Sequence, residues 1–270
     1  MSYPVYLVNA FTEQYYKGNQ AAVVMVEEFP ADTSLQALAR EFGFSETAYV
    51  KRLGFGKYQI RWFTPEIEVN LCGHATLAAA KVLFHEIIPQ EKLILFQSLG
   101  GDLLARKQRE GIQLDFPTDP PLPIEADGKM LKALSQANAE EILFSAFTQN
   151  LIVVYKDAET VRSLKPDFSI LNKLNNHKIA GIAVTAADTG KYDYICRYFA
   201  PQEGINEDPV TGSAQTCLAP YWGNRLGKLE LNGWQASERG GEFKIRLTEN
   251  RILISGRAFI YLKGELKRGF

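Results

Sequence analysis

Arg61-Trp-Phe-Thr-Pro-Glu66 and Arg197-Tyr-Phe-Ala-Pro-Gln202 are two versions of one stretch of sequence, separated by 136 positions. Phe11-Thr12 recurs as Phe147-Thr148 at the same separation. Matches that keep the same order and spacing indicate an internal duplication. Because the separation is close to half of the 270 residues, we expect two α/β halves of similar length.

In both halves, a glycine follows the proline and opens an apolar segment. The first half has Leu71-Cys-Gly-His-Ala75, and the second has Val210-Thr-Gly-Ser-Ala214, with its glycine 139 positions later. Gly100-Gly101 then recurs as Gly240-Gly241 at a separation of 140. The segment after the first glycine is apolar on nearly all sides, as in a buried helix. We therefore expect each half to be a curved sheet wrapped around one central helix.

A cluster of prolines between residues 117 and 123 marks the linker between the halves. We expect an N-terminal lobe at 1–117 and a C-terminal lobe at 124–257. A strand at about 258–270 is a candidate to return to the first lobe. Any active site is expected where the two halves face each other.

Composition excludes several classes of function. The 30 Lys and Arg residues nearly balance 31 Asp and Glu residues, and no basic run interleaved with aromatics predicts a nucleic-acid partner. No signal peptide and no apolar run of about 18 residues is evident, so we expect a cytoplasmic protein without membrane contact. The chain has three cysteines, Cys72, Cys196 and Cys217, and such a small, odd number does not suit a disulfide framework. We expect no metal and no cofactor, since zinc, calcium, Walker A and dinucleotide patterns are all missing.

The two glycine turns are candidate anion-binding sites. The first N–H groups of a helix lack intrahelical partners, and the helix dipole favours negative charge there. Glycine lets a ligand approach that backbone closely. The residues concerned are Cys72, Gly73, His74, Thr211, Gly212 and Ser213. The alternative is that both glycines are ordinary N-terminal residues and that Ser213 is only a cap.

Differences between the halves point to the chemistry. Glu46, flanked by small and apolar residues, has Ile182 as its counterpart 136 positions later. Desolvation of such a carboxyl would favour its protonated form, which makes Glu46 a candidate general acid and base. The alternative is a solvent-facing strand residue. Asp208 supplies a carboxylate to the second loop, and His74, at a helix start, would donate to an anion or serve structure alone.

Several motifs resemble one known family along the whole chain. They are Gly18-Asn-Gln-Ala-Ala-Val-Val, Phe44-Ser-Glu-Thr-Ala-Tyr-Val, Trp62-Phe-Thr-Pro, Cys72-Gly-His-Ala-Thr, Glu207-Asp-Pro-Val-Thr-Gly-Ser-Ala, Glu238-Arg-Gly-Gly and Ile254-Ser-Gly-Arg-Ala. The sequence resembles the phenazine-biosynthesis PhzF-like family. The resemblance implies the α+β diaminopimelate-epimerase fold, with two pseudo-symmetric lobes, each a curved, mostly antiparallel sheet around a central helix.

The resemblance also implies an activity. The family's studied member isomerises a dihydro-hydroxyanthranilate by a cofactor-independent proton shift, in a cleft between the lobes. Carried over to matching positions, Glu46 is the acid/base, and His74, Asp208 and Ser213 are the other catalytic positions. The substrate-binding positions are Asn19, Cys72, Gly73, Thr211 and Gly212. The expected partner is a small carboxylate substrate, and the resemblance further suggests a homodimer.

Two other functions stay open from the residues. Related epimerases use two opposed thiols, but here Cys72 has no thiol counterpart, since Asp208-Pro209 stands in the second copy. An amino-acid epimerase would therefore have to combine Cys72 with Glu46 or Asp208. The other alternative is a non-catalytic protein that binds a small ligand.

Overall fold

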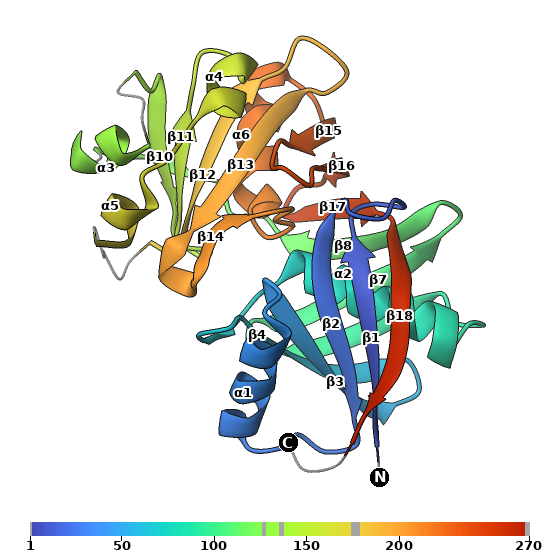
Figure 1. Ribbon diagram of the computed structural model, residues 1–270. Helices are drawn as coiled ribbons and strands as arrows, with labels where there is room; N and C mark the ends of the chain where they lie inside the picture. The colour runs from blue at the N-terminus through green and yellow to red at the C-terminus, as the bar shows by residue number, and fades with distance from the viewer. Residues whose placement is uncertain (1, 126–127, 135–137, 174–178, 268–270) are drawn as a thin grey trace. The chain divides into compact units, whose positions relative to one another are not determined.

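The computed structural model describes residues 2–125, 128–134, 138–173 and 179–267. The chain divides into two compact units, with unit 1 comprising Met1–Phe116 and Leu253–Phe270 and unit 2 comprising Pro117–Ile252. Each unit is an α+β structure built on a mostly antiparallel sheet (Figure 1). Within the described residues, no helix combines the length and apolar character that crossing a membrane requires.

The elements of unit 1 are β1 (Tyr3–Ala10), β2 (Asn19–Val26), α1 (Asp32–Phe42), β3 (Glu46–Gly54), β4 (Lys57–Phe63), β5 (Glu68–Val69), α2 (Gly73–Val82), the π-helical turn η1 (Leu83–Ile87), β6 (Leu93–Ser98), β7 (Gly101–Gln108), β8 (Gly111–Pro117) and β18 (Ala258–Leu266). Strand β17 (Arg251–Gly256) carries the chain from unit 2 into unit 1.

The elements of unit 2 are β9 (Leu122–Pro123), α3 (Gly128–Ala133), β10 (Glu141–Ser145), β11 (Asn150–Val154), α4 (Ala158–Ser163), α5 (Phe168–Lys173), β12 (Gly181–Ala187), β13 (Tyr194–Ala200), the 3-10 turn η2 (Pro201–Glu203), β14 (Ile205–Asp208), α6 (Gln215–Leu226), β15 (Glu230–Gln235) and β16 (Gly241–Leu247).

The two units repeat one order of strand pairing. In unit 1, β18, β1 and β2 pair antiparallel, β2 is parallel to β3, β3 antiparallel to β4, β4 parallel to β6, and β6 antiparallel to β7. In unit 2, β9, β10, β11, β12, β13, β15 and β16 follow with the same alternation of directions. Each parallel pair requires a crossover, and helices occupy these connections in both units.

Helix α2 lies at the centre of unit 1 because it has no polar face that could be exposed to solvent. Every residue of α2 except Lys81 is buried. The helix packs against β1, β2, β3 and β18, and it lies behind β1 and β2 in Figure 1. In unit 2, α6 packs against β15 and β16, and its buried Trp222 indole donates to Thr185 Oγ1 at 2.9 Å. Each unit thus wraps strands around one helix.

A bidentate ion pair recurs in the two units. Arg61 Nε and Nη2 each donate to a Glu68 carboxylate oxygen at 2.7 Å. Arg197 makes the same pair of bonds to Glu207 at 2.7 and 2.8 Å, and its Nη1 donates to the Leu164 carbonyl at the end of α4. The carboxylates of Glu68 in β5 and Glu207 in β14 are therefore held by arginine and stabilise the fold.

Arg197→Lys is expected to lower the free energy of unfolding by about 1–3 kcal/mol, because an ammonium cannot make the two parallel bonds and also reach the Leu164 carbonyl. Urea unfolding measures this change. Arg162→Lys is the matched control, since Arg162 forms a partly exposed 3.4 Å ion pair with Asp188 and the change should stay within about 0.5 kcal/mol. Equal losses in the two variants would contradict the assignment.

Candidate functional site

The buried polar residues of unit 1 come together where β2, β3 and α2 begin. Asn19 is the first residue of β2, and Glu46 is the first residue of β3. Because β2 and β3 run parallel, with Ala21 opposite Glu46, the two strands begin at the same end of the sheet. His74 is the second residue of α2, which packs on these strands. Asn19, Glu46 and His74, each at or near the start of its strand or helix, therefore form one cluster.

Gly18 fixes how the chain enters β2. Its φ of +68° lies in the left-handed region, and a Cβ built on it would sit 2.2 Å from the Ala10 carbonyl oxygen. Only glycine is accommodated at such a position. The next residue, Asn19, is buried.

The imidazole of His74 connects the cluster. Asn19 Nδ2 lies 3.0 Å from His74 Nδ1, and because an amide nitrogen can only donate, Nδ1 accepts. The ring proton of the neutral imidazole is therefore assigned to Nε2. His74 Nε2 lies 3.1 Å from Glu46 Oε2, a distance of an ion pair, although the contact lacks the alignment of a hydrogen bond. The Glu46 side chain is 12% exposed and that of His74 only 2%.

Cys72 places a thiol beside the same ring. Its Sγ lies 3.6 Å from His74 Nδ1 and is buried. The Glu46 carboxylate, the Cys72 thiol and the His74 imidazole offer ligand atoms within 4.8 Å of one another. Such a mixture of O, S and N donors is one that Zn²⁺ accepts in proteins. The expectation of no metal rested on spacing along the chain, which does not detect ligands brought together by tertiary structure.

The start of α2 offers an environment for negative charge. Cys72 is the N-cap residue and makes no side-chain capping bond. Gly73 opens the helix and is buried. The helix dipole therefore places partial positive charge next to the Glu46 and His74 side chains. A carboxylate or a developing oxyanion would be stabilised at this position.

The second predicted turn is built differently. Asp208 ends β14, is buried, and accepts from Thr211 Oγ1 at 2.6 Å. Gln235 accepts from the Thr211 backbone N–H at 2.8 Å and donates to the Asp208 carbonyl oxygen at 2.7 Å. The hydroxyl and the backbone N–H of Thr211 thus bond within unit 2, and a ligand would have to displace them.

Helix α6 corrects the expectation that Gly212 opens the second helix. The helix begins at Gln215, and Gly212, Ser213 and Ala214 form a turn before it. Bonds from the N–H groups of Gln215 and Thr216 to the carbonyls of Gly212 and Ser213 tighten this turn. Ser213 is half-buried and does not cap the helix.

The thiols of unit 2 are poor proton carriers. Burial raises the pKa of Cys196 to about 12, and burial together with the nearby Asp119 carboxylate raises the pKa of Cys217 to about 12. Cys217 lies inside α6 and donates to the Ala214 carbonyl at 3.0 Å. Neither thiol would ionise near neutral pH, so a pair of opposed thiolates has no support in unit 2.

Glu203 is a functional candidate that the sequence reasoning did not find. It ends η2, and burial together with the nearby Asp208 carboxylate raises its pKa to about 7. Its neighbours in the chain, Gln202 and Gly204, give no sign of this environment. A carboxyl that holds its proton near neutral pH is able to donate a hydrogen bond or to exchange a proton.

Glu203→Gln is expected to raise the melting temperature at pH 8 more than at pH 4.5. Glutamate in an unfolded chain titrates near pH 4.3, so the folded protein holds this proton more tightly. The stabilisation of the wild-type protein by the protonated Glu203 carboxyl is fully present below about pH 4 and is lost as the pH rises through about 7. Calorimetry at both pH values measures the difference, with exposed Glu249→Gln as control. An equal shift at both pH values would contradict the raised pKa.

Comparison with known proteins places the chain in a family. The family model described as "Phenazine biosynthesis-like protein" matches residues 8–264. A Pseudomonas aeruginosa protein named as an uncharacterized isomerase is 41% identical over 266 residues, covering 98% of this chain and 99% of that one. A crystal structure of a PhzF-family protein from Enterococcus faecalis is 42% identical, with a TM-score of 0.90 and coverage of 99% of this chain and 100% of that one.

More distant structures share the fold alone. A probable proline racemase from Agrobacterium radiobacter has a TM-score of 0.69 at 11% identity, covering 99% of this chain and 93% of that one. The diaminopimelate-epimerase-like architecture is thus present in this chain. The family model covers nearly all of the sequence, so the chain belongs to the phenazine biosynthesis-like, or PhzF, family.

Proposed function

We propose that this protein is a cofactor-independent isomerase that moves a proton between carbons of a small carboxylate substrate. The observation that carries the proposal is the buried Glu46 carboxylate, 3.1 Å from an imidazole whose tautomer is set by Asn19. The names of the relatives, which include an isomerase and a PhzF-family protein, support the class of reaction.

Glu46 is assigned the role of general acid and base. Its carboxylate takes a proton from a substrate carbon, and the carboxylic acid so formed returns a proton one or more atoms along the conjugated system. The pair of electrons left by the first transfer spreads onto the substrate as a dienolate. Acid–base assistance of this kind contributes about 10²–10⁴-fold to the rate.

His74 and the start of α2 complete the environment of the reaction. The Nε2 of His74 lies 3.1 Å from Glu46 Oε2, so its proton adds a favourable electrostatic contact to that carboxylate. The N-terminus of α2 at Gly73, with Cys72 making no capping bond, favours the substrate carboxylate or the dienolate charge. Asn19 acts through His74 by fixing its tautomer.

The turn of unit 2 keeps the roles that the sequence assigned to it as predictions. Asp208 and Ser213 are proposed polar groups for the reaction, and Thr211 and Gly212 are proposed contacts for the substrate. The bonds of Thr211 to Asp208 and Gln235 favour a role in holding this turn in shape.

One observation favours a second function. Cys72 Sγ, 3.6 Å from His74 Nδ1, has a base next to it, as an epimerase thiol would need. An epimerase would use Cys72 on one face of the substrate carbon and Glu46 or Asp208 on the other. The raised pKa values of Cys196 and Cys217 leave such an enzyme without a second thiolate in unit 2.

Glu46→Gln is expected to fold normally and to lower solvent deuterium exchange into substrate by about 10²–10⁴-fold, because an amide neither accepts nor returns the proton. Proton NMR in D₂O, with a dihydro-hydroxyanthranilate as the first probe and a panel of small carboxylates after it, measures the exchange. Glu41→Gln, an exposed carboxylate on α1, is the control and should keep the wild-type rate.

Exchange at the wild-type rate in Glu46→Gln would overturn the assignment. Two further arms separate the alternatives. Loss of activity in Cys72→Ser together with racemisation of an amino acid by the wild type would favour the epimerase. Loss of activity after treatment with a chelator, restored by Zn²⁺, would show that the Glu46, Cys72 and His74 cluster works through a metal.

A further inference from the structure

Unit 1 has a cavity at the opposite end of α2 from His74. It has a volume of about 380 Å³ and is lined by the last turn of α2, the π-helical turn η1, the hairpin between β7 and β8, and the start of β18. Lys81 and His74 are seven residues apart on α2, which corresponds to about 10 Å along the helix axis. The volume lies within the range of small-ligand sites.

The side chains that line this cavity carry a net positive charge. Four cations and two carboxylates contribute to the lining, which gives a formal charge of +2: Lys81, Lys107, Arg109, Arg257, Glu13 and Glu110. Both carboxylates are bonded to Arg257, and Glu110 accepts from its Nη2 at 3.1 Å. The remaining cations are therefore not balanced by acidic groups in the lining.

Lys81 is the most unusual of these cations. It is the one residue of α2 that is not fully buried, and within the described residues its ammonium forms no direct ion pair and no hydrogen bond. Desolvation and the nearby Lys107 lower the pKa of Lys81, against a smaller opposite effect of the Glu13 and Glu86 carboxylates. Both carboxylates are bonded to other cations, Glu13 to Arg257 and Glu86 to Lys263. A half-buried ammonium without a direct partner is unfavourable unless an anion joins it.

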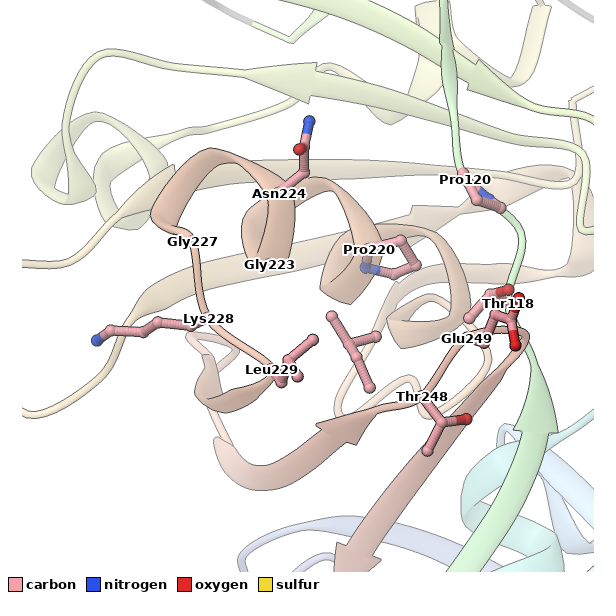
Figure 2. A pocket seen from close by; sticks show the side chains of 11 residues that line it. Thr118, Pro120, Pro220, Gly223, Asn224, Gly227, Lys228, Leu229, Thr248 and Glu249 are labelled. Carbon is pink, nitrogen blue, oxygen red and sulfur yellow. The ribbon is translucent and has the colours of Figure 1, made fainter.

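Unit 2 has a cavity of about 370 Å³ at the equivalent place (Figure 2). It lies at the end of α6, beside the turn after β16, as the first cavity lies at the end of α2 beside the turn after β7. Six lining positions of the first cavity have counterparts in the second at a separation of 139 or 140, the same separations that relate Gly73 to Gly212 and Gly100 to Gly240.

The cations at these equivalent positions occur in the first copy only. At the equivalent positions, unit 2 has Pro220 for Lys81, Leu247 for Lys107 and Glu249 for Arg109. The cation that does line the second cavity, Lys228, donates to Asp193 at 2.5 Å. The fold alone thus produces a cavity at this place without any need for positive charge. The charge of the first cavity needs a separate explanation.

We propose that the cavity at the end of α2 binds a small anionic molecule through an oxyanion group, a phosphate or a carboxylate, that pairs with Lys81. Arg109 and Lys107 lie in the same lining and add to the positive field. Strong binding needs a group of more than one negative charge, because the formal charge of the lining is +2. The cavity is separate from the Glu46 cluster, so the proposal does not depend on the proposed reaction.

Isothermal titration of the full-length protein at low salt, with pyrophosphate and citrate as probes, tests the proposal. Wild type is expected to bind at least one probe, and Lys81→Met to weaken that binding by about ten- to a hundredfold through loss of one charge-assisted bond. Preference for pyrophosphate would identify a phosphate ligand, and preference for citrate a carboxylate. Binding of neither probe by the wild type would overturn the proposal.

Two further variants keep the test decisive. Arg109→Gln removes an exposed cation of the same lining and should also weaken binding, even if Lys81→Met does not fold. Arg106→Gln removes an equal charge from β7 outside the lining and should leave the affinity within about twofold. Equal weakening by Arg106→Gln and Arg109→Gln would show that binding depends only on the overall positive charge of the surface. That result would contradict a specific site in this cavity.

Discussion

Helix α2 can be stable only if strands enclose it, because nearly all of its side chains are apolar or buried. Enclosure by β1, β2, β3 and β18 presses its first turn against the starts of two parallel strands. The same packing leaves its last turn, with Lys81, at the edge of the unit, where a cavity forms. One packing constraint therefore sets both the position of His74 beside Glu46 and the position of the cationic cavity.

The site of unit 1 has no equivalent in unit 2, although the strands pair in the same order. Ile182 stands opposite Leu151 as Glu46 stands opposite Ala21, so an aliphatic side chain takes the place of the carboxylate. The Tyr198 hydroxyl donates to Asn150 Oδ1 at 2.7 Å and fills the space over Gly181. The second unit thus keeps the scaffold and closes the place where the first unit holds its acid.

Much of the architecture could be predicted because its signals are local. Pro65 and Pro201 follow the ends of β4 and β13, since proline cannot donate within a ladder. The apolar segment after Gly73 forms the buried helix that its composition predicted. The start of α6 was predicted wrongly, because the turn at Gly212 uses glycine, serine and alanine, which also suit a first helical turn.

The contacts of the site could not be predicted from the same signals. The 3.1 Å distance between Glu46 and His74 depends on the register of β2 against β3 and on how α2 packs on these strands. Local sequence patterns predict neither. The raised pKa of Glu203 depends on its desolvation in the folded unit and on the nearby Asp208 carboxylate. Family resemblance supplied the residue names at these positions, while the structure supplies the hydrogen bond between Asn19 and His74.

The role proposed for His74 is tested most directly by measuring which of its ring nitrogens carries a proton. ¹⁵N NMR of protein labelled at histidine distinguishes a protonated ring nitrogen from an unprotonated one. We expect an unprotonated Nδ1, which accepts from Asn19, and a protonated Nε2, which faces Glu46. A neutral ring with its proton on Nδ1 would contradict it, because the imidazole would then present no N–H to the carboxylate.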